Sequence, residues 1–280
     1  MAEFSAVTPA LVNSTVTNCV KVLAAMSMSW GAGGGWTVLP FARGCDKVLA
    51  LWGEPIMELD IDALGEDVGL FDAIRTCRHI RRLKPDPVPK ALIRKVCEAG
   101  TFAPSGGNRQ PWLFVAVMDP ERRRFIAERY REAFMSYIEP ARQAARAPDY
   151  PDAKRRNMNA AIYLAEHLHE APVHLFVAGW KRRGEAQVQA LYPAIQNVLL
   201  ACRAVGLGAS LTSVHRAFGE EIDEFLGLSE ATPSCALLPI GWPKGRYGQP
   251  PRASVDEKLF FDRVEGVDLT ARERRADAPR

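Results

Sequence analysis

The stretch from Ala103 to Trp112, Ala-Pro-Ser-Gly-Gly-Asn-Arg-Gln-Pro-Trp, holds the side chains of this sequence best suited to bind an organic ring. Ser105, Asn108 and Gln110 carry hydroxyl and amide groups, which both donate and accept hydrogen bonds. The paired glycines between them let the backbone turn sharply and approach another surface closely. The stretch is therefore suited to hydrogen-bond the polar edge of a heterocycle. The alternative is an ordinary helix-to-strand loop, because such loops favour the same residues.

A second stretch, Arg78 to Pro89, is suited to bind phosphate. It begins Arg-His-Ile-Arg-Arg-Leu-Lys and ends Pro-Val-Pro. Arginine supplies a planar, permanently charged fork that matches the geometry of a phosphate group. The alternative is that Arg81 and Arg82 form a solvated, charged face.

The sequence gives little support for a hydrolase nucleophile or for a metal site. Ser105 and Ser213 lack the sequence pattern that surrounds the nucleophile of a hydrolase. The five histidines have no metal-binding spacing, so we expect each to be a surface or core residue. What remains is a set of phosphate and amide ligands without an evident acid, base or metal. Such a set is typical of an enzyme whose chemistry is carried by a bound cofactor.

Composition narrows the class further. The net charge of +3 is too slight to indicate nucleic-acid binding, and basic and acidic residues are interleaved. No run of 18 or more uncharged apolar residues indicates a membrane span. The six cysteines form no Cys-x-x-Cys pair and no zinc spacing, so we expect buried thiols and a cytoplasmic location.

Helical and strand patterns alternate from residue 70 onward, which predicts an α/β-type domain. Asp119-Pro120 is a typical helix start, and Gly206 a typical helix stop. The helix ending there is apolar on all sides, which predicts a core helix of a large domain or of a dimer interface. The predicted helices are 70–77, 88–102, 120–137, 153–170, 187–205 and 220–226, the predicted strands are 112–118, 173–180, 208–213 and 235–240, and 140–152 is predicted to be a loop.

The two ends of the chain differ from its middle. Residues 1–65 have no clear hydrophobic period, and we expect an N-terminal extension that is disordered or an over-extended start, with Met57 as the true initiator. Residues 66–262 are predicted to form the folded domain. Residues 263–280 are predicted to be a charged, solvated tail.

The two polar stretches, taken in order, resemble the FMN-dependent nitroreductase family. That family shows an arginine-rich run, Pro-Val-Pro, a helix, and an Ala-Pro-Ser-x-x-Asn-x-Gln-Pro-Trp loop. Further matches are Gln196-Asn197, the run from Gly206 to Ser213, and Leu238 to Pro243. The resemblance covers roughly Leu70 to Asp262. It implies a mixed central sheet flanked by helices, built as an intertwined homodimer.

The resemblance also implies roles by position. The arginine-rich run corresponds to the family's grip on the flavin phosphate and ribityl chain, although His79 stands where the family often has serine. The loop lies against the isoalloxazine, with Asn108 reaching its polar edge, either from the same subunit or from the other. A late arginine completes the phosphate site, for which Arg252 fits better than Arg246. The candidate cofactor-binding residues are Arg78, His79, Arg81, Pro104, Ser105, Asn108, Gln110, Leu211, Thr212, Ser213, Arg246 and Arg252.

The function implied is that of an FMN-dependent oxidoreductase. NAD(P)H would reduce the flavin, which would then reduce an electron-poor acceptor such as a nitroaromatic or a quinone. The alternatives are a protein that binds FMN without turnover, and a deiodinase-like or flavin-cleaving member of the same superfamily. The physiological acceptor and the preference for NADH or NADPH stay open.

Overall fold

The computed structural model describes residues 28–30, 36–38, 60–182, 185–186 and 188–266. The proposed start at Met57 lies outside the described residues, as does most of the predicted N-terminal extension. Within that extension, β1 (Met28–Trp30) pairs with β2 (Trp36–Val38) in an antiparallel hairpin. Of the residues described from 60 onward, Ile61 and Leu64 are the first that belong to the largest hydrophobic cluster, where both are buried.

A four-stranded sheet forms the centre of the described body. Its order is β3 (Trp112–Val117), β4 (Val173–Gly179), β8 (Ser234–Gly241) and β7 (Gly208–Ala209), and each neighbouring pair is antiparallel. Every residue of the two central strands is buried. This explains why both strands appear in the sequence as almost continuous apolar runs rather than alternating ones. The short antiparallel pair β5 (Lys181–Arg182) and β6 (Glu185–Ala186) was not predicted.

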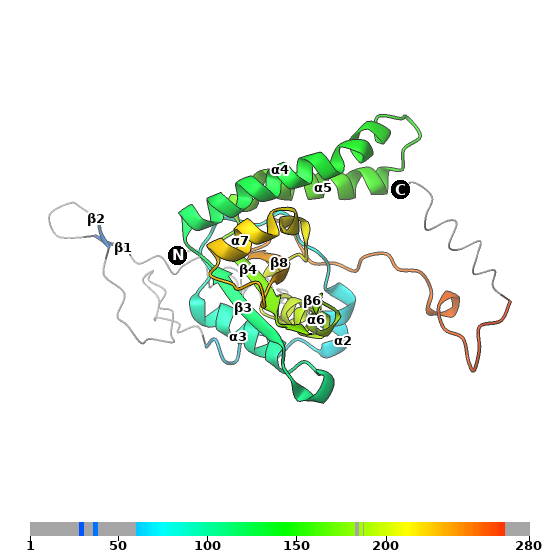
Figure 1. The fold of residues 1–280 in the computed structure, drawn as a ribbon, viewed down its shortest axis with the longest axis horizontal. Helices are drawn as coiled ribbons and strands as arrows, with labels where there is room; N and C mark the ends of the chain where they lie inside the picture. The colour runs from blue at the N-terminus through cyan, green and yellow to red at the C-terminus, as the bar shows by residue number, and fades with distance from the viewer. Residues whose placement is uncertain (1–27, 31–35, 39–59, 183–184, 187, 267–280) are drawn as a thin grey trace, which may run out of the picture.

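One face of the sheet is covered by α3 (Lys90–Thr101) and α6 (Val188–Ala204), with α2 (Leu70–Thr76) beside α6. Figure 1 shows these helices below the sheet. Leu92, Val96 and Val198 are fully buried between them. The largest cluster fills this layer, so the strongly apolar α6 is a core helix, as predicted. Gly206 adopts φ +82°, the left-handed conformation expected just after the end of this helix.

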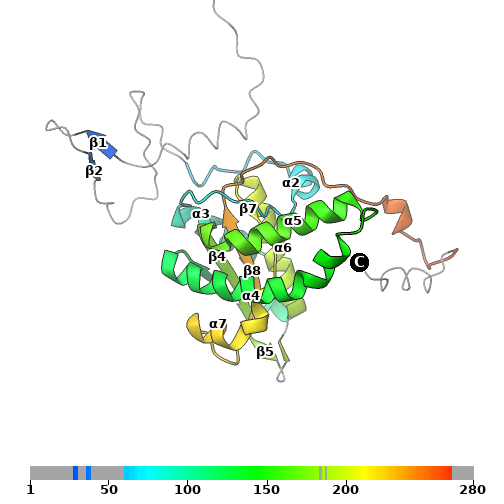
Figure 2. The ribbon, with the colours of Figure 1, turned by 90° about the horizontal axis from the view of Figure 1, so that it is seen from above.

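The other face is covered by the long helix α4 (Pro120–Ala144) and by α5 (Asp152–His167). The two helices lie side by side across the sheet (Figures 1 and 2). The turn η2 (Leu168–Glu170) follows α5, and η3 (Val214–Phe218) and α7 (Gly219–Phe225) complete the layer. Ile126, Phe176 and Leu237 belong to the second hydrophobic cluster, which lies between these elements and the sheet.

The end of α4 corrects a prediction. We expected this helix to stop near Tyr137 and a loop to begin at Pro140, but α4 continues through Pro140 to Ala144. A proline inside a helix removes one backbone hydrogen bond. Here Pro140 is exposed, so water can satisfy the released carbonyl group. Arg155 of α5 then closes the connecting loop by donating from Nη2 to the carbonyl oxygen of Tyr150 at 3.2 Å.

The chain after β8 leaves the body along an extended path that contains only the short turn η4 (Val255–Glu257) in the described residues (Figure 1). This segment exposes several apolar side chains, among them Leu259 and Phe261. None of the helices in the described part of the chain combines the length and hydropathy needed to cross a lipid bilayer. The described body as a whole is a sheet with helices on both faces, which is the expected arrangement.

Candidate functional site

The arginine segment, residues 78–82, is held at the edge of the sheet by backbone hydrogen bonds. Ile80 N donates to the carbonyl oxygen of Ala209 at 2.9 Å, next to β7. Farther along, Lys84 N donates to the Trp242 oxygen at 2.7 Å, and Lys244 N donates to the Arg82 oxygen at 2.9 Å. The segment therefore lies between β7 and the chain that follows β8, and its backbone position is fixed.

Buried apolar residues are interspersed with exposed or partly exposed charged residues along this segment and at Leu83, which follows it. Ile80 and Leu83 point inward and are buried, whereas Arg78 and Arg82 are exposed. Gly208 makes the close approach possible, because a Cβ atom there would lie 2.8 Å from Leu83 Cδ2 and 2.9 Å from Ile80 Cγ2. The apolar residues thus anchor the segment, and the charged residues between them are presented at the surface.

Positive charge gathers around His79. The ring keeps an accessible surface, but the protein atoms around it lower the pKa of His79 by desolvation, and the charges of Arg81 and Arg252 lower it further. The charge of Arg252 therefore acts on the arginine segment, although the two are far apart in the sequence. Arg78 donates from Nη2 to the carbonyl oxygen of Arg246 at 2.8 Å, which places the backbone of Arg246 at the same corner.

Thr212 reaches this corner from the strand-like chain after β7. Its backbone exchanges two hydrogen bonds with Leu237, at 2.9 and 2.8 Å. Its Oγ1 atom lies 3.0 Å from the hydroxyl of Tyr130, a buried residue of α4. Burial lowers the pKa of Arg81, and the electrostatic effect of the nearby Tyr130 raises it by a smaller amount. We call the arginine segment together with Tyr130, Thr212 and Arg252 the arginine corner.

The arginine corner carries uncompensated charge. In the part of the chain that the structure describes, neither Arg78 nor Arg81 forms an ion pair with a carboxylate. By contrast, Arg203 and Arg129 pair with Asp72 and Glu221. The exposed guanidinium group of Arg78 and the partly buried one of Arg81, neither with a carboxylate partner in the described residues, are suited to bind an anion, and phosphate matches their geometry.

The polar loop, residues 103–110, lies elsewhere. It precedes β3, at the opposite edge and the opposite end of the sheet from Ile80, because Trp112 pairs with Gly179 and Gly208 pairs with Gly241. With about 3.3 Å per residue along a strand and about 4.8 Å between strands, the start of β3 and the end of the sheet at β7, beside the arginine segment, are roughly 25 Å apart. In Figure 1 the loop protrudes on the side of the molecule away from α4 and α5.

The polar loop is exposed and conformationally unusual. Pro104, Asn108 and Gln110 are exposed, and the loop contains the turn η1 (Gly106–Asn108). Asn108 and Gln110 adopt φ values of 51° and 48°, in the left-handed region that is unfavourable for residues other than glycine. Ser105 Oγ accepts a hydrogen bond from Gln110 N at 2.9 Å, which helps to hold this conformation.

The structure thus divides the predicted site residues into two groups. Arg78, His79, Arg81, Thr212 and Arg252 meet at the arginine corner, with the backbone of Arg246. Ser213 is exposed beside Thr212, whereas Leu211 packs toward the large cluster on the other face of the sheet. The second group, Pro104, Ser105, Asn108 and Gln110, lies on the distant polar loop.

Sequence reasoning missed Tyr130. The sequence patterns place it in the predicted helix 120–137 and give it no role in a site, whereas its phenol is enclosed within the arginine corner. A signal was present, because Ile126, Tyr130 and Phe134 recur at the spacing of one buried helix face. That pattern predicts burial but not a polar partner on another element.

The histidines agree with the expected surface or core roles. His174 and His215 are fully buried, and burial lowers the pKa of each to about 4, so both are neutral at physiological pH. Each makes one hydrogen bond, to Leu168 O and Ser234 Oγ respectively. Within the described residues, no group of three histidine, cysteine or acidic side chains is arranged to hold a metal ion.

Comparison with known proteins identifies the class. The family model described as "Nitroreductase family" matches residues 74–242. This match spans more than half of the chain, and the protein therefore belongs to the nitroreductase family, which consists of oxidoreductases. The resemblance drawn from the polar stretches is confirmed.

Relatives within the family differ in activity. The 5,6-dimethylbenzimidazole synthase of Rhodospirillum rubrum is 30% identical over 192 residues, 65% of this chain and 83% of that protein. The NADH dehydrogenase of Thermus thermophilus is 30% identical over 186 residues, 59% of this chain and 82% of that protein. A crystal structure of iodotyrosine deiodinase bound to FMN and 3-iodo-L-tyrosine shares the fold, with a TM-score of 0.56 at 22% identity, covering 70% of this chain and all of that one. The predicted fold class is confirmed.

Proposed function

We propose that this protein is an FMN-dependent oxidoreductase that passes reducing equivalents from NAD(P)H through the bound flavin to an electron-poor acceptor. The observation that carries the proposal is the arginine corner, where Arg78 and Arg81 have no carboxylate partners among the described residues and lie with Thr212 on a fixed backbone. Family membership and the FMN-bound structure of a related fold support the choice of flavin.

The residues present fit the chemistry of FMN. Arg78, Arg81 and Arg252 supply positive charge for the phosphate, and the charges of Arg81 and Arg252 add to the desolvation that lowers the pKa of His79. Thr212 and Ser213 supply hydroxyl groups toward the ring. Pro104, Ser105, Asn108 and Gln110 supply an apolar surface and amide groups for the ring and its polar edge. When bound, FMN supplies the hydride and electron transfer, and these residues bind it, orient it and exclude water.

The arginine segment and the polar loop are too far apart for one FMN to reach both within a single chain. The separation of roughly 25 Å exceeds the length of one extended FMN molecule. We therefore propose a homodimer in which the polar loop of one subunit completes the arginine corner of the other. The exposed apolar side chains of Phe102, Trp180 and Phe261 are suited to be covered in such an interface.

The remaining assignments follow from the same reading. We place the FMN-binding domain at residues 66–262, and the residues that pack with it include Ile61. We place the charged tail at 263–280 and the protein in the cytoplasm. The cysteines in the described residues are free thiols, in keeping with a reducing compartment. The small net charge gives no reason to propose a nucleic-acid partner.

The deciding experiment is the absorption spectrum of the purified protein, with FMN and then with NADH or NADPH added anaerobically. We expect uptake of one FMN per chain and bleaching of its visible absorption by at least one nicotinamide. Uptake without bleaching would favour a flavin-sequestering protein, and loss of the flavin itself in oxygen would favour a flavin-cleaving enzyme. Reduction of 3-iodo-L-tyrosine would favour a deiodinase. Failure to bind FMN would overturn the proposal.

Subunit mixing tests the composite site. Arg81→Gln damages only the arginine corner, and Ser105→Ala combined with Asn108→Ala damages only the polar loop. Random exchange of subunits between the two variants turns about half of the dimers into heterodimers. If each site takes one part from each subunit, every heterodimer has one intact site and one doubly damaged site. About a quarter of all sites should therefore recover. Recovery of no sites after complete exchange would show that both parts belong to the same subunit.

A further inference from the structure

Tyr130 is a buried phenol inside the arginine corner. Only 2% of its surface is exposed, and its hydroxyl lies 3.0 Å from Thr212 Oγ1. The same Oγ1 atom accepts a hydrogen bond from Val214 N at 3.4 Å. Thr212 Oγ1 therefore has two hydrogen-bond partners, the phenol of Tyr130 on α4 and the backbone N–H of Val214, two residues farther along the chain.

The direction of the Tyr130–Thr212 hydrogen bond follows from the surrounding charge. Burial raises the pKa of Tyr130, while the Thr212 hydrogen bond and the charge of Arg81 lower it by less. The phenol is therefore protonated at physiological pH. A guanidinium group has donors and no acceptor, so Arg81 favours the lone pairs of the phenol oxygen on its own side. Either hydroxyl could donate across the 3.0 Å contact, and the charge of Arg81 favours the arrangement in which the phenol proton points toward Thr212 Oγ1.

With the hydrogen bond in this direction, only one part of the Thr212 hydroxyl group is left to bond a further partner. A threonine hydroxyl has one proton and two lone pairs. Val214 N–H and Tyr130 O–H occupy both lone pairs, so only the proton is available to a third partner. The backbone of Thr212 is fixed by its two hydrogen bonds to Leu237, which leaves rotation of the hydroxyl as the one degree of freedom that Tyr130 controls.

We propose that Tyr130 is a positioning residue that holds Thr212 as a hydrogen-bond donor toward an acceptor atom of the bound ring. This rests on the proposed FMN site and adds to it the polarity of one contact. A ring that presents an acceptor to Thr212 is bound more tightly than one that presents a donor. Because the oxidised and reduced forms of a flavin ring differ in protonation, Tyr130 acts on the relative affinity for the two forms.

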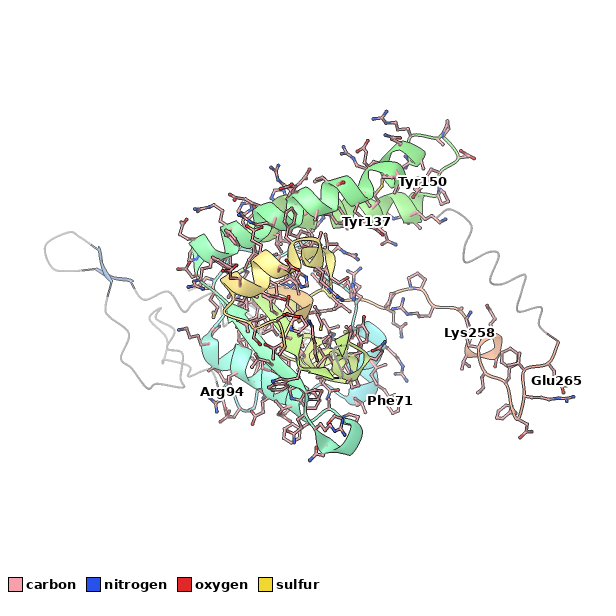
Figure 3. All side chains as sticks on the ribbon, in the orientation of Figure 1. Phe71, Arg94, Tyr137, Tyr150, Lys258 and Glu265 are labelled. Atoms are coloured by element: carbon pink, nitrogen blue, oxygen red, sulfur yellow. The ribbon has the colours of Figure 1, made fainter. Side chains whose placement is uncertain are left out.

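The test measures dissociation constants for oxidised and reduced FMN, and from them the shift in flavin reduction potential. Tyr130→Phe removes the phenol oxygen, Thr212→Val removes the hydroxyl, and Thr212→Ser keeps it. Tyr137→Phe is the matched control, since Tyr137 also belongs to α4 but has 73% of its surface exposed (Figure 3). We also measure the double variant Tyr130→Phe/Thr212→Val.

We expect Tyr130→Phe and Thr212→Val to change the ratio of the two dissociation constants in the same direction, each by about threefold to tenfold, the effect of one hydrogen bond. The double variant should match Thr212→Val alone, because Tyr130 acts through Thr212. Thr212→Ser and Tyr137→Phe should keep the ratio of the unsubstituted protein.

An unchanged ratio in Tyr130→Phe, even with a lower melting temperature, would assign Tyr130 a packing role and overturn the inference. Additive changes in the double variant would also overturn it, because Tyr130 would then act independently of Thr212. Failure of the unsubstituted protein to bind FMN would instead remove the proposed function on which the inference rests, and the two failures are thus distinguishable.

Discussion

The arginine corner and the polar loop are both rich in ligand-binding side chains, but they are held in different ways. At the arginine corner, backbone hydrogen bonds to Ala209 and Trp242 and close packing against Gly208 fix the segment within one chain. The polar loop is exposed, and two of its non-glycine residues have positive φ. The comparison is in keeping with the proposed dimer, in which the fixed arginine corner of one subunit is completed by the exposed polar loop of the other.

The largest expected effect is at the arginine corner. Arg81→Gln should weaken FMN binding by about tenfold to a hundredfold, because a charge-assisted hydrogen bond to phosphate contributes roughly 1.5–3 kcal/mol. Arg131→Gln, an equal loss of charge at an exposed position of α4, should change the affinity by about twofold or less. Fluorescence titration with FMN at fixed ionic strength measures both. Equal losses would mean that only net charge matters and that the arginine corner is no specific site.

Gly208→Ala should disturb the same corner through packing. The new methyl group would meet Leu83 and Ile80 at less than 3 Å, so the arginine segment must shift, at a cost of about 1–3 kcal/mol in unfolding free energy. FMN affinity should fall with it. Gly219→Ala at the start of α7 is the control, because a Cβ there meets nothing within 4 Å. Urea denaturation gives the free energies, and a stability for Gly208→Ala equal to that of the control would refute the close packing.

Acid should weaken the packing of η3 against the sheet, at the end of β8 away from the arginine segment. His215 follows Thr212 closely, and its pKa in the folded protein is about 4, below the usual value of 6.5. The unfolded chain therefore binds more protons between these values, and stability is lost as the pH falls below about 6.5. The loss between pH 7 and pH 5 should be about 1–2 kcal/mol for this histidine. His215→Gln should remove that part of the pH dependence, whereas His169→Gln, at an exposed position, should leave it intact. An unaltered pH profile in His215→Gln would contradict this.

The smallest effect is expected in the polar loop. Gln110→Gly should leave the unfolding free energy within about 0.5 kcal/mol, because relief of the left-handed backbone offsets the greater freedom of glycine in the unfolded chain. Gln196→Gly, the same change at an exposed position inside α6, should cost about 1 kcal/mol. Equal costs for the two variants would show that the loop carries no backbone strain.

Local patterns predicted much of this fold. The Asp119 cap, which accepts from Arg122 N at 2.9 Å, and the left-handed Gly206 were read from single residues. The predicted end of α4 is too early, because Pro140 is exposed and water can satisfy the carbonyl group that it releases, so the helix continues to Ala144. The pair β5 and β6 was missed because strands of two residues have no period to detect.

The candidate site shows a different limit of sequence reasoning. Motif order placed Arg78, Thr212 and Arg252 in one site, and the structure brings them to one corner, while their cofactor contacts stay predictions. No local pattern could show that the polar loop lies at the opposite corner of the sheet, since this depends on strand order. Nor could one show that Tyr130 meets Thr212, which is 82 residues away in the sequence.

The way the arginine segment is anchored also has a consequence for folding. Its partners come late in the chain, for the hydrogen bond between Arg78 and Arg246 joins residues 168 apart in sequence. Contacts of such long range close large loops, and they form slowly compared with local helices. During synthesis the corner cannot close until the chain beyond β8 has emerged. A ligand that binds there would stabilise only chains that have completed folding, and its concentration would set how many remain folded.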